Sequence, residues 1–190
     1  RTDTYFQKSW TEACKTRFYE QYPNALNKKI ILWTPTFRGN AGKPYQVGTD
    51  EILKLEQELG GEYFVIRKVH PHIEAKYHLS NCSIPSEELL VVADLMITDY
   101  SSIVFDYLFF RKPYVLFAPD IEEYMEDRGF YIEYESLSPY VVTDGKNLAE
   151  NVKDALEKSD KSWIEEQYHY HLSSCDGKAT ERILNYLELE

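Results

Sequence analysis

Two serines between an apparent strand and helix are of a type that could bind an anion. In DLMITDYSSIVFDYLFFRKP (94–113), an apolar run ends at Asp99, and Ser101 and Ser102 precede a second apolar run without any glycine. A serine at a helix start can bond free backbone N–H groups, and the helix dipole favours an anion there. The same residues also fit a plain helix cap with no ligand. Asp106, one helical turn after Ser102, is an acid in an apolar helix, so we expect it to hold the loop or a ligand hydroxyl.

A group of basic and imidazole side chains follows another apolar run. RKVHPH (67–72) contains Arg67, Lys68, His70 and His72. An imidazole at a strand end can donate to a phosphate or stabilise a leaving group. A solvated surface turn explains the same residues without a ligand.

Two further loops carry charge just after apolar runs. TPTFRGNAGK (34–43) contains Arg38 and Lys43, and the planar fork of an arginine suits a phosphate. APDIEEY (118–124) contains acids that can accept hydrogen bonds from ribose hydroxyls. The alternatives are a mobile surface loop and a helix that Asp120 caps.

Composition limits the kind of ligand. The 190 residues are 43% hydrophobic, which is typical of a globular domain. The formal net charge of −11 disfavours nucleic acid and anionic membranes as partners. A phosphorylated ligand therefore needs a local cationic pocket. The three cysteines are far apart and form no CxxC, which indicates free thiols rather than a disulfide framework or a zinc site.

The ends and the apolar runs bear on context. No run approaches the roughly 20 residues that span a bilayer, and the polar start shows no signal-peptide pattern. The chain begins with Arg1 rather than Met, so we expect it to be a piece of a longer protein. The histidines of Tyr168-His169-Tyr170-His171 are two apart and would not share a helix face, so we expect no metal there.

Short apolar runs alternate with amphipathic segments. They predict strands at 28–35, 62–68, 94–99, 113–118 and 140–143, and helices at 4–21, 49–59, 86–93, 101–110, 120–127, 146–157, 161–173 and 178–189. This alternation predicts a Rossmann-like, three-layer α/β/α domain with a mainly parallel sheet. Ligands of such sheets bind beyond the carboxyl ends of the strands. The four charged loops therefore predict a nucleotide-diphosphate pocket, while the missing G-x-x-x-x-G-K-[ST] and G-x-G-x-x-G motifs exclude a P-loop and give no support for a dinucleotide site.

A series of short motifs runs along the whole chain. In order, they are RTD (1–3), ILWTPTFRG (31–39), RKVHPH (67–72), LMITDYSS (95–102), FDY (105–107), KP (112–113), EEY (122–124), RGFY (128–131) and CDGKATERI (175–183). Together they resemble the CDP-glycerol glycerophosphotransferase family of teichoic-acid polymerases and primases. The resemblance implies a fold similar to the C-terminal half of a GT-B glycosyltransferase. Residues 1–190 then form a single donor-binding domain, with a helix over 1–21 after an interdomain linker and a C-terminal helix within 175–190. The N-terminal acceptor domain is absent from this sequence.

The resemblance also implies an activity. The donor is CDP-glycerol, CMP leaves, and glycerol phosphate passes to a lipid-linked teichoic-acid or related cell-wall acceptor held by the missing half. No cofactor and no metal are expected. The full-length bacterial protein is expected in the cytoplasm, peripheral at the inner face of the cell membrane, and the isolated fragment is expected to be inactive.

Residue roles follow by position in the motifs. His70 corresponds to the essential histidine of the His-Pro motif, and Ser101 and Ser102 to a pyrophosphate site. The remaining expected donor-binding residues are Thr36, Arg38, Arg67, Asp99, Asp120, Glu123 and Arg128. Trp33 and Phe37 depart from the family's aromatic arrangement, which leaves base and loop contacts open.

Three other interpretations fit parts of the sequence. A GT-B glycosyltransferase domain could use another activated donor, CDP-ribitol or a UDP-sugar. A receiver-like signalling domain would use Asp99 as its phospho-acceptor, although the first strand lacks the usual acidic pair. A binding module without catalysis fits a fragment.

Overall fold

One parallel sheet forms the centre of the domain. The structure, a computed structural model, describes residues 2–40, 42–70, 73, 82–158 and 160–188. Within these ranges the sheet has five strands in the order β2-β1-β3-β4-β5, every neighbouring pair parallel. The strands are β1 (Lys29–Thr34), β2 (Tyr63–Arg67), β3 (Leu95–Thr98), β4 (Tyr114–Phe117) and β5 (Val141–Val142).

Both faces of the sheet are buried, which explains the continuous apolar strands. Side chains alternate between faces along a strand. Ile30 and Leu32 join one hydrophobic cluster, whereas Ile31 and Trp33 join the other, and all four are at most 2% exposed. A parallel sheet needs such cover on both faces.

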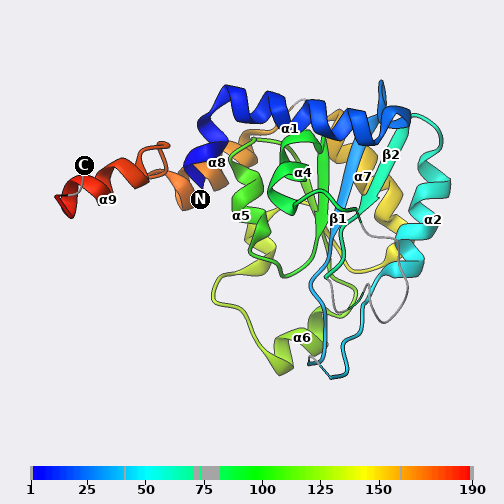
Figure 1. The fold of residues 1–190 in the computed structure, drawn as a ribbon. Helices are drawn as coiled ribbons and strands as arrows, with labels where there is room; N and C mark the ends of the chain where they lie inside the picture. Colours follow the sequence, from blue (N-terminus) through cyan, green and yellow to red (C-terminus); the bar gives the residue numbers. More distant parts are fainter. Residues whose placement is uncertain (1, 41, 71–72, 74–81, 159, 189–190) are drawn as a thin grey trace.

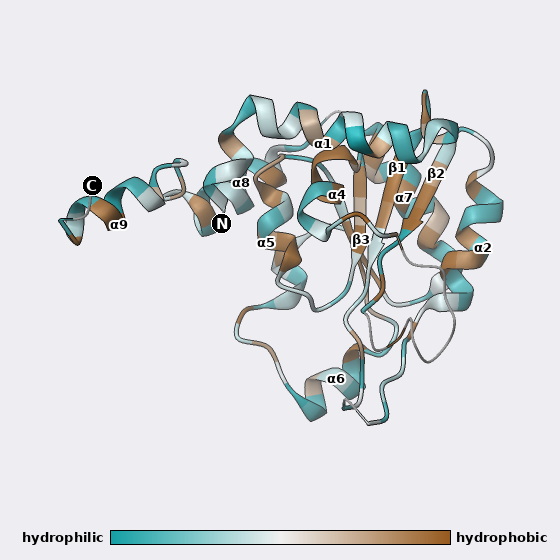
Figure 2. Ribbon diagram, in the orientation of Figure 1, coloured by the Kyte–Doolittle hydropathy of each residue, from teal (hydrophilic) through white to brown (hydrophobic). Residues whose placement is uncertain are grey.

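Helices supply that cover (Figure 1). One face packs against α1 (Lys8–Gln21), α4 (Ser86–Val92), α5 (Ile103–Leu108) and α8 (Ser162–Leu172), and the other against α2 (Thr49–Leu59) and α7 (Leu148–Glu157). In Figure 2 the strands between these helices are mostly apolar and the outer helix surfaces mostly polar. The predicted Rossmann-like three-layer α/β class is confirmed.

Two helices lie outside these layers. α6 (Ile121–Asp127) lies beyond the carboxyl ends of the strands and contains no buried residue. α9 (Ala179–Tyr186) also has no buried residue and extends away from the sheet in Figure 1. None of the described helices is long and apolar enough to cross a membrane.

Several predicted boundaries were wrong. The expected helix at 4–21 is a 3-10 turn over Thr2–Phe6 followed by α1 from Lys8, because Gln7 has an extended backbone (φ −90°, ψ 108°). The strand expected at 140–143 keeps only two residues in the sheet. Short 3-10 turns that were not predicted lie at Pro23–Ala25, Tyr134–Leu137 and Gly145–Asn147, and the last helix ends at Tyr186 rather than 189.

The first and last motifs of the sequence meet in space. The carboxylate of Asp3 accepts hydrogen bonds from the backbone N–H groups of Ala179 (3.2 Å) and Thr180 (2.7 Å), at the start of α9. Gly177 has φ 80°, and a β-carbon there would lie 2.9 Å from the Phe6 ring. An acidic residue near the start of the chain therefore caps its last helix.

Candidate functional site

The strand order fixes where a ligand is expected. The first and third strands are neighbours at the centre of the sheet, and the connections from them run to opposite sides. In open α/β sheets the ligand crevice lies at this switch point, beyond the carboxyl ends of the strands. The loops after β1, β3 and β4 meet there, next to α6, at the lower end of the molecule in Figure 1.

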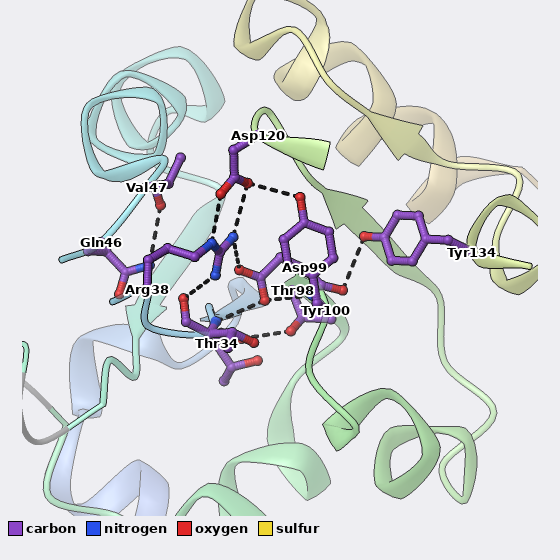
Figure 3. A network of polar contacts seen from close by, with 10 residues as sticks. Thr34, Arg38, Gln46, Val47, Thr98, Asp99, Tyr100, Asp120 and Tyr134 are labelled. Atoms are coloured by element: carbon purple, nitrogen blue, oxygen red, sulfur yellow. Dashed lines mark hydrogen bonds and ion pairs between the residues drawn. The ribbon is translucent and has the colours of Figure 1, made fainter. Parts of the chain in front are cut away.

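Arg38 joins these three loops (Figure 3). Its Nε donates to Asp120 Oδ2 at 2.7 Å and its Nη2 to Asp120 Oδ1 at 3.0 Å. Nη2 also lies 2.9 Å from Asp99 Oδ2, and Nη1 donates to the Thr36 carbonyl oxygen. Only 5% of the side chain is exposed. Burial opposes the charge of the guanidinium, but the bonds to Asp120 and Asp99 outweigh it and raise the pKa of Arg38.

Asp99 organises the backbone at the end of β3. Its Oδ1 accepts from the N–H groups of Thr36 (2.8 Å) and Tyr100 (2.7 Å), while its Oδ2 faces Arg38. Burial raises the pKa of Asp99, although Arg38 and the Thr36 N–H favour its charged form. A carboxylate thus ties two loops together here without any glycine in the turn.

Asp120 belongs to the same network rather than capping α6. Its side chain makes no capping bond, and Oδ1 instead accepts from the Tyr100 hydroxyl at 2.9 Å. Partial burial opposes ionisation, but the bonds from Arg38 and Tyr100 prevail and lower the pKa of Asp120. The simple-cap alternative for Asp120 is therefore wrong.

Aromatic rings enclose the arginine. Tyr100 and Tyr124 stack with centroids 3.7 Å apart, and the guanidinium carbon of Arg38 lies 4.7 Å and 5.4 Å from their respective centroids. Phe130 stacks on Tyr134 at 4.9 Å, and the Tyr134 hydroxyl donates to the Asp99 carbonyl oxygen at 3.1 Å. Sequence reasoning missed these rings as part of the site, although Tyr100, Tyr124 and Phe130 lie in the motifs LMITDYSS, EEY and RGFY.

Two hollows open beside this network and share Asp120 and Glu123. One, of about 360 Å³, lies between the loop after β1 and α6, and the other, of about 380 Å³, lies at the start of α6. The first is lined by Arg38, Gly39, Tyr45, Asp120, Glu123, Tyr124, Asp127 and Arg128. The second is lined by Pro119, Asp120, Ile121, Glu122, Glu123 and Thr143. The walls combine carboxylates, tyrosine rings and one partly exposed cation.

Arg128 is that cation. Its side chain is 41% exposed, Nη2 donates to the Gly39 carbonyl oxygen at 3.4 Å, and Nε lies 3.5 Å from Asp127. These contacts are long, so the guanidinium can turn toward an anion in the first hollow.

The serine pair is only loosely tied to its helix. Ser102 is exposed, and its side chain makes no capping bond to α5. Ser101 Oγ accepts from the Ile103 N–H at a long 3.4 Å. A plain cap by Ser102 is therefore wrong. Thr36, on the neighbouring loop, has a buried Oγ1 without a hydrogen-bond partner among the described residues.

The basic loop after β2 lies beside the loop after β1. The rings of His70 and Phe37 are 4.6 Å apart and tilted by 40°. Arg67 is 3.4 Å from Glu56 of α2, and Lys68 donates to the Cys82 carbonyl oxygen. The structure therefore brings His70 to the neighbouring loop, while Arg67 and Lys68 bond to the protein.

The remaining histidines that the sequence singled out lie apart from this network or outside the described residues. His72 lies outside the described residues. Within the described ranges, no group of three or more His, Cys, Asp or Glu side chains is arranged to hold a metal ion. His171 packs against Phe105, with ring centroids 4.8 Å apart.

Solved structures share this fold over most of the chain. The wall teichoic acid polymerase TagF matches with a TM-score of 0.80 and 26% identity, covering 99% of this chain and 50% of that one. A TagF variant soaked with CDPG matches with a TM-score of 0.78 and 26% identity, covering 99% of this chain and 48% of TagF. A UDP-N-acetylglucosamine 2-epimerase from Listeria monocytogenes, described as putative in that structure, matches with a TM-score of 0.54 and 18% identity over 94% of this chain and 51% of that one. The epimerase shows the shared fold alone.

Curated relatives point the same way. A teichoic acid poly(ribitol-phosphate) polymerase from Bacillus spizizenii is 32% identical over 98% of this chain and 32% of its own length. A teichoic acid glycerol-phosphate primase from Bacillus subtilis is 28% identical over 98% of this chain and 49% of its own length. The chain thus spans between about a third and half of these relatives. Because the family model for CDP-glycerol:poly(glycerophosphate) glycerophosphotransferase matches residues 1–189, the chain belongs to that family.

Proposed function

We propose that this chain is the donor-binding half of a transferase that moves glycerol phosphate from CDP-glycerol to a teichoic-acid or related cell-wall polymer. The observation that carries the proposal is the family match over residues 1–189. The meeting of three charged strand-end loops at the switch point of the sheet supports it.

The proposed reaction is a phosphoryl transfer. An acceptor hydroxyl oxygen attacks the β-phosphorus of the donor, the bond from that phosphorus to the bridging oxygen breaks, and CMP leaves with the electron pair. The acceptor loses its hydroxyl proton in the same process. Such reactions depend on positioning and on neutralising the developing charge, so the protein need not form a covalent bond.

Several side chains suit these tasks. We assign His70 to the donor phosphate as the catalytic residue. We assign Ser101 and Ser102 to the diphosphate, since Ser102 is exposed and its side chain makes no bond that caps α5. Glu123 is assigned to the ribose hydroxyls, because it lines both hollows, and Arg128 to the glycerol phosphate. The proposal names no cofactor, because the nucleotide is a substrate.

The other expected donor-binding residues divide by their contacts. Arg67 is paired with Glu56, and the side chains of Arg38, Asp99 and Asp120 bond to one another. The hydroxyl of Thr36 is buried, so a donor contact there requires the loop after β1 to shift on binding. We keep Thr36 as such a contact and assign the bonded side chains to the support of the loops.

CDP-ribitol is the second candidate donor. The Bacillus spizizenii relative carries a ribitol-phosphate name, whereas the Bacillus subtilis relative carries a glycerol-phosphate name. The two donors share the cytidine diphosphate, so the loops described above suit both. The choice then depends on contacts to the polyol.

Donor titration tests the proposal. The full-length protein is titrated calorimetrically with CDP-glycerol, CDP-ribitol, CDP and UDP-N-acetylglucosamine. We expect tightest binding of CDP-glycerol and only weak binding of the UDP-sugar. Tighter CDP-ribitol binding would favour the second candidate, and a preference for the UDP-sugar would overturn the proposal.

The receiver-like alternative is not supported by the surroundings of Asp99. A receiver domain can share this strand order, but the Asp99 side chain is 5% exposed and bonded to Arg38 and two backbone N–H groups. We expect no labelling by acetyl phosphate.

Acceptor and membrane contacts belong, in this proposal, to the part of the protein outside this sequence. The chain carries a net charge of −11, which disfavours an anionic bilayer. We propose a lipid-linked acceptor and a peripheral position at the inner face of the cell membrane for the full-length protein. Vesicle flotation of the full-length protein, with this chain alone as the comparison, tests that placement.

A further inference from the structure

One side chain, that of Arg38, contacts all three loops at the candidate site. The carbonyl oxygen of Thr36 belongs to the loop after β1, Asp99 to the loop after β3, and Asp120 to the loop after β4, and all three accept from Arg38. These loops are distant in the sequence, so their spacing depends on tertiary contacts.

The guanidinium has little capacity left for a ligand. Its Nε, Nη1 and Nη2 each bond to a protein oxygen, and Tyr100 and Tyr124 lie within cation–π distance. Four of its five N–H groups are thus engaged and only 5% of the side chain is exposed, so the guanidinium offers a phosphate in the first hollow little surface.

We propose that Arg38 is a positioning residue, which sets the spacing of the three loops and thereby the affinity for the nucleotide donor without touching the donor. This inference rests on the proposed function. It assigns to Arg38 a different role from that of a phosphate ligand.

The path from Arg38 to the donor contacts is short. Asp99 holds the N–H groups of Thr36 and Tyr100, and Tyr100 directly precedes Ser101. Asp120 directly precedes α6, which carries Glu123. A change in the bonds of the Arg38 guanidinium would therefore shift the loop that carries Ser101 and Ser102 relative to α6.

Two conservative variants separate the two roles. Arg38→Lys keeps the charge but loses the planar fork that spans both carboxylates. Asp99→Asn retains Oδ1 for the two backbone N–H groups but replaces Oδ2 by an amide that donates toward Nη2 of Arg38.

Arg111→Lys is the matched control. Arg111 also pairs with a carboxylate, Glu165 at 3.0 Å, and lies over the Tyr168 ring at 3.8 Å. These partners belong to α8, away from the strand-end loops.

The affinity for CDP-glycerol and CDP is measured by calorimetry on the full-length protein and its variants. We expect Arg38→Lys and Asp99→Asn each to raise the Kd about tenfold, and the control to stay within about twofold. A direct phosphate ligand predicts the opposite sign for Asp99→Asn, since removing a negative charge beside Arg38 would strengthen binding of an anion. Tighter or unchanged binding by Asp99→Asn would overturn the proposal, as would a uniform loss of melting temperature without a change in Kd.

Amide hydrogen exchange without ligand separates this inference from the proposed function. In Arg38→Lys we expect faster exchange at the amides of Thr36 and Tyr100, whose acceptor is Asp99. Unchanged protection would overturn the positioning role. If exchange is faster in Arg38→Lys but the wild type binds neither nucleotide, Arg38 positions the loops but has no role in donor affinity. That outcome would overturn both the proposed function and this inference.

Discussion

At the scale of single residues, replacing His70 distinguishes a chemical role of its imidazole from a packing role. Its ring contacts Phe37 at 4.6 Å in a half-buried position. If the imidazole assists transfer, His70→Ala in the full-length enzyme should lower kcat by roughly a hundredfold or more, a typical loss for a general acid or base. The melting temperature should change by only a few degrees, measured on the same preparation.

A matched histidine provides the control for this experiment. His171 contacts Phe105 at 4.8 Å and is also half-buried, but it lies on α8. His171→Ala should therefore lower stability by a similar amount with no loss of turnover. Parallel losses of activity and stability in the His70 variant would show that His70 only packs.

Asp120 predicts a pH dependence of stability. Its pKa is lowered from an ordinary value of 3.8 in the folded state, so its ionic bonds stabilise the fold fully above pH 3.8 and lose that effect as the pH falls through the lowered value. Asp120→Asn should therefore cost about 2 kcal/mol at pH 7, a usual value for hydrogen bonds to a charged group. The difference from wild type should shrink below pH 3.8.

Urea unfolding at a series of pH values measures this difference. Asp127→Asn, at the last residue of α6 and 78% exposed, is the control and should show little change at any pH. A cost of Asp120→Asn that stays constant down to pH 2 would show that the charge of Asp120 does not contribute.

At the scale of elements, local rules predicted the regular structure better than the caps. The strand interiors followed from apolar runs such as Ile30–Trp33, because burial on both faces leaves no other composition. Asp120 was a reasonable cap by its position, but Arg38 competes for it from 82 residues away. Conversely, Asp3 was not predicted as a cap, but it caps a helix at the other end of the chain. The four loops could be predicted as one edge, but their partners could not, because tertiary contacts decide them.

The cap from Asp3 leads to a prediction for α9. No residue of α9 is buried, so tertiary packing contributes little to its stability and the cap should matter more than in a packed helix. Asp3→Ala should speed amide exchange across Ala179–Tyr186 while leaving exchange in the strands unchanged. Asp144→Ala removes a cap of the same kind, to the Lys146 N–H, and serves as the control. Unchanged exchange in α9 after the Asp3 substitution would show that other contacts hold the helix.

At the scale of the whole molecule, two hydrophobic clusters on opposite faces of one sheet give this chain a core of its own. The alignments with the two named relatives cover 98% of this chain but only 32% and 49% of the lengths of the relatives. Donor binding, as proposed, needs only the strand-end loops of this chain. Transfer also needs an acceptor site, which the proposal places in the rest of the protein.

Residues 1–190 alone should therefore bind CDP-glycerol but not transfer glycerol phosphate. Calorimetry with the isolated chain should give a Kd within about tenfold of the full-length value, because the loops joined by Arg38 all lie within it. Incorporation of labelled glycerol phosphate into a polymer acceptor should be absent with this chain and restored with the full-length protein. Transfer by the isolated chain at the full-length rate would place the acceptor site on this domain. Donor binding seen only in the full-length protein would instead place essential donor contacts in the other half.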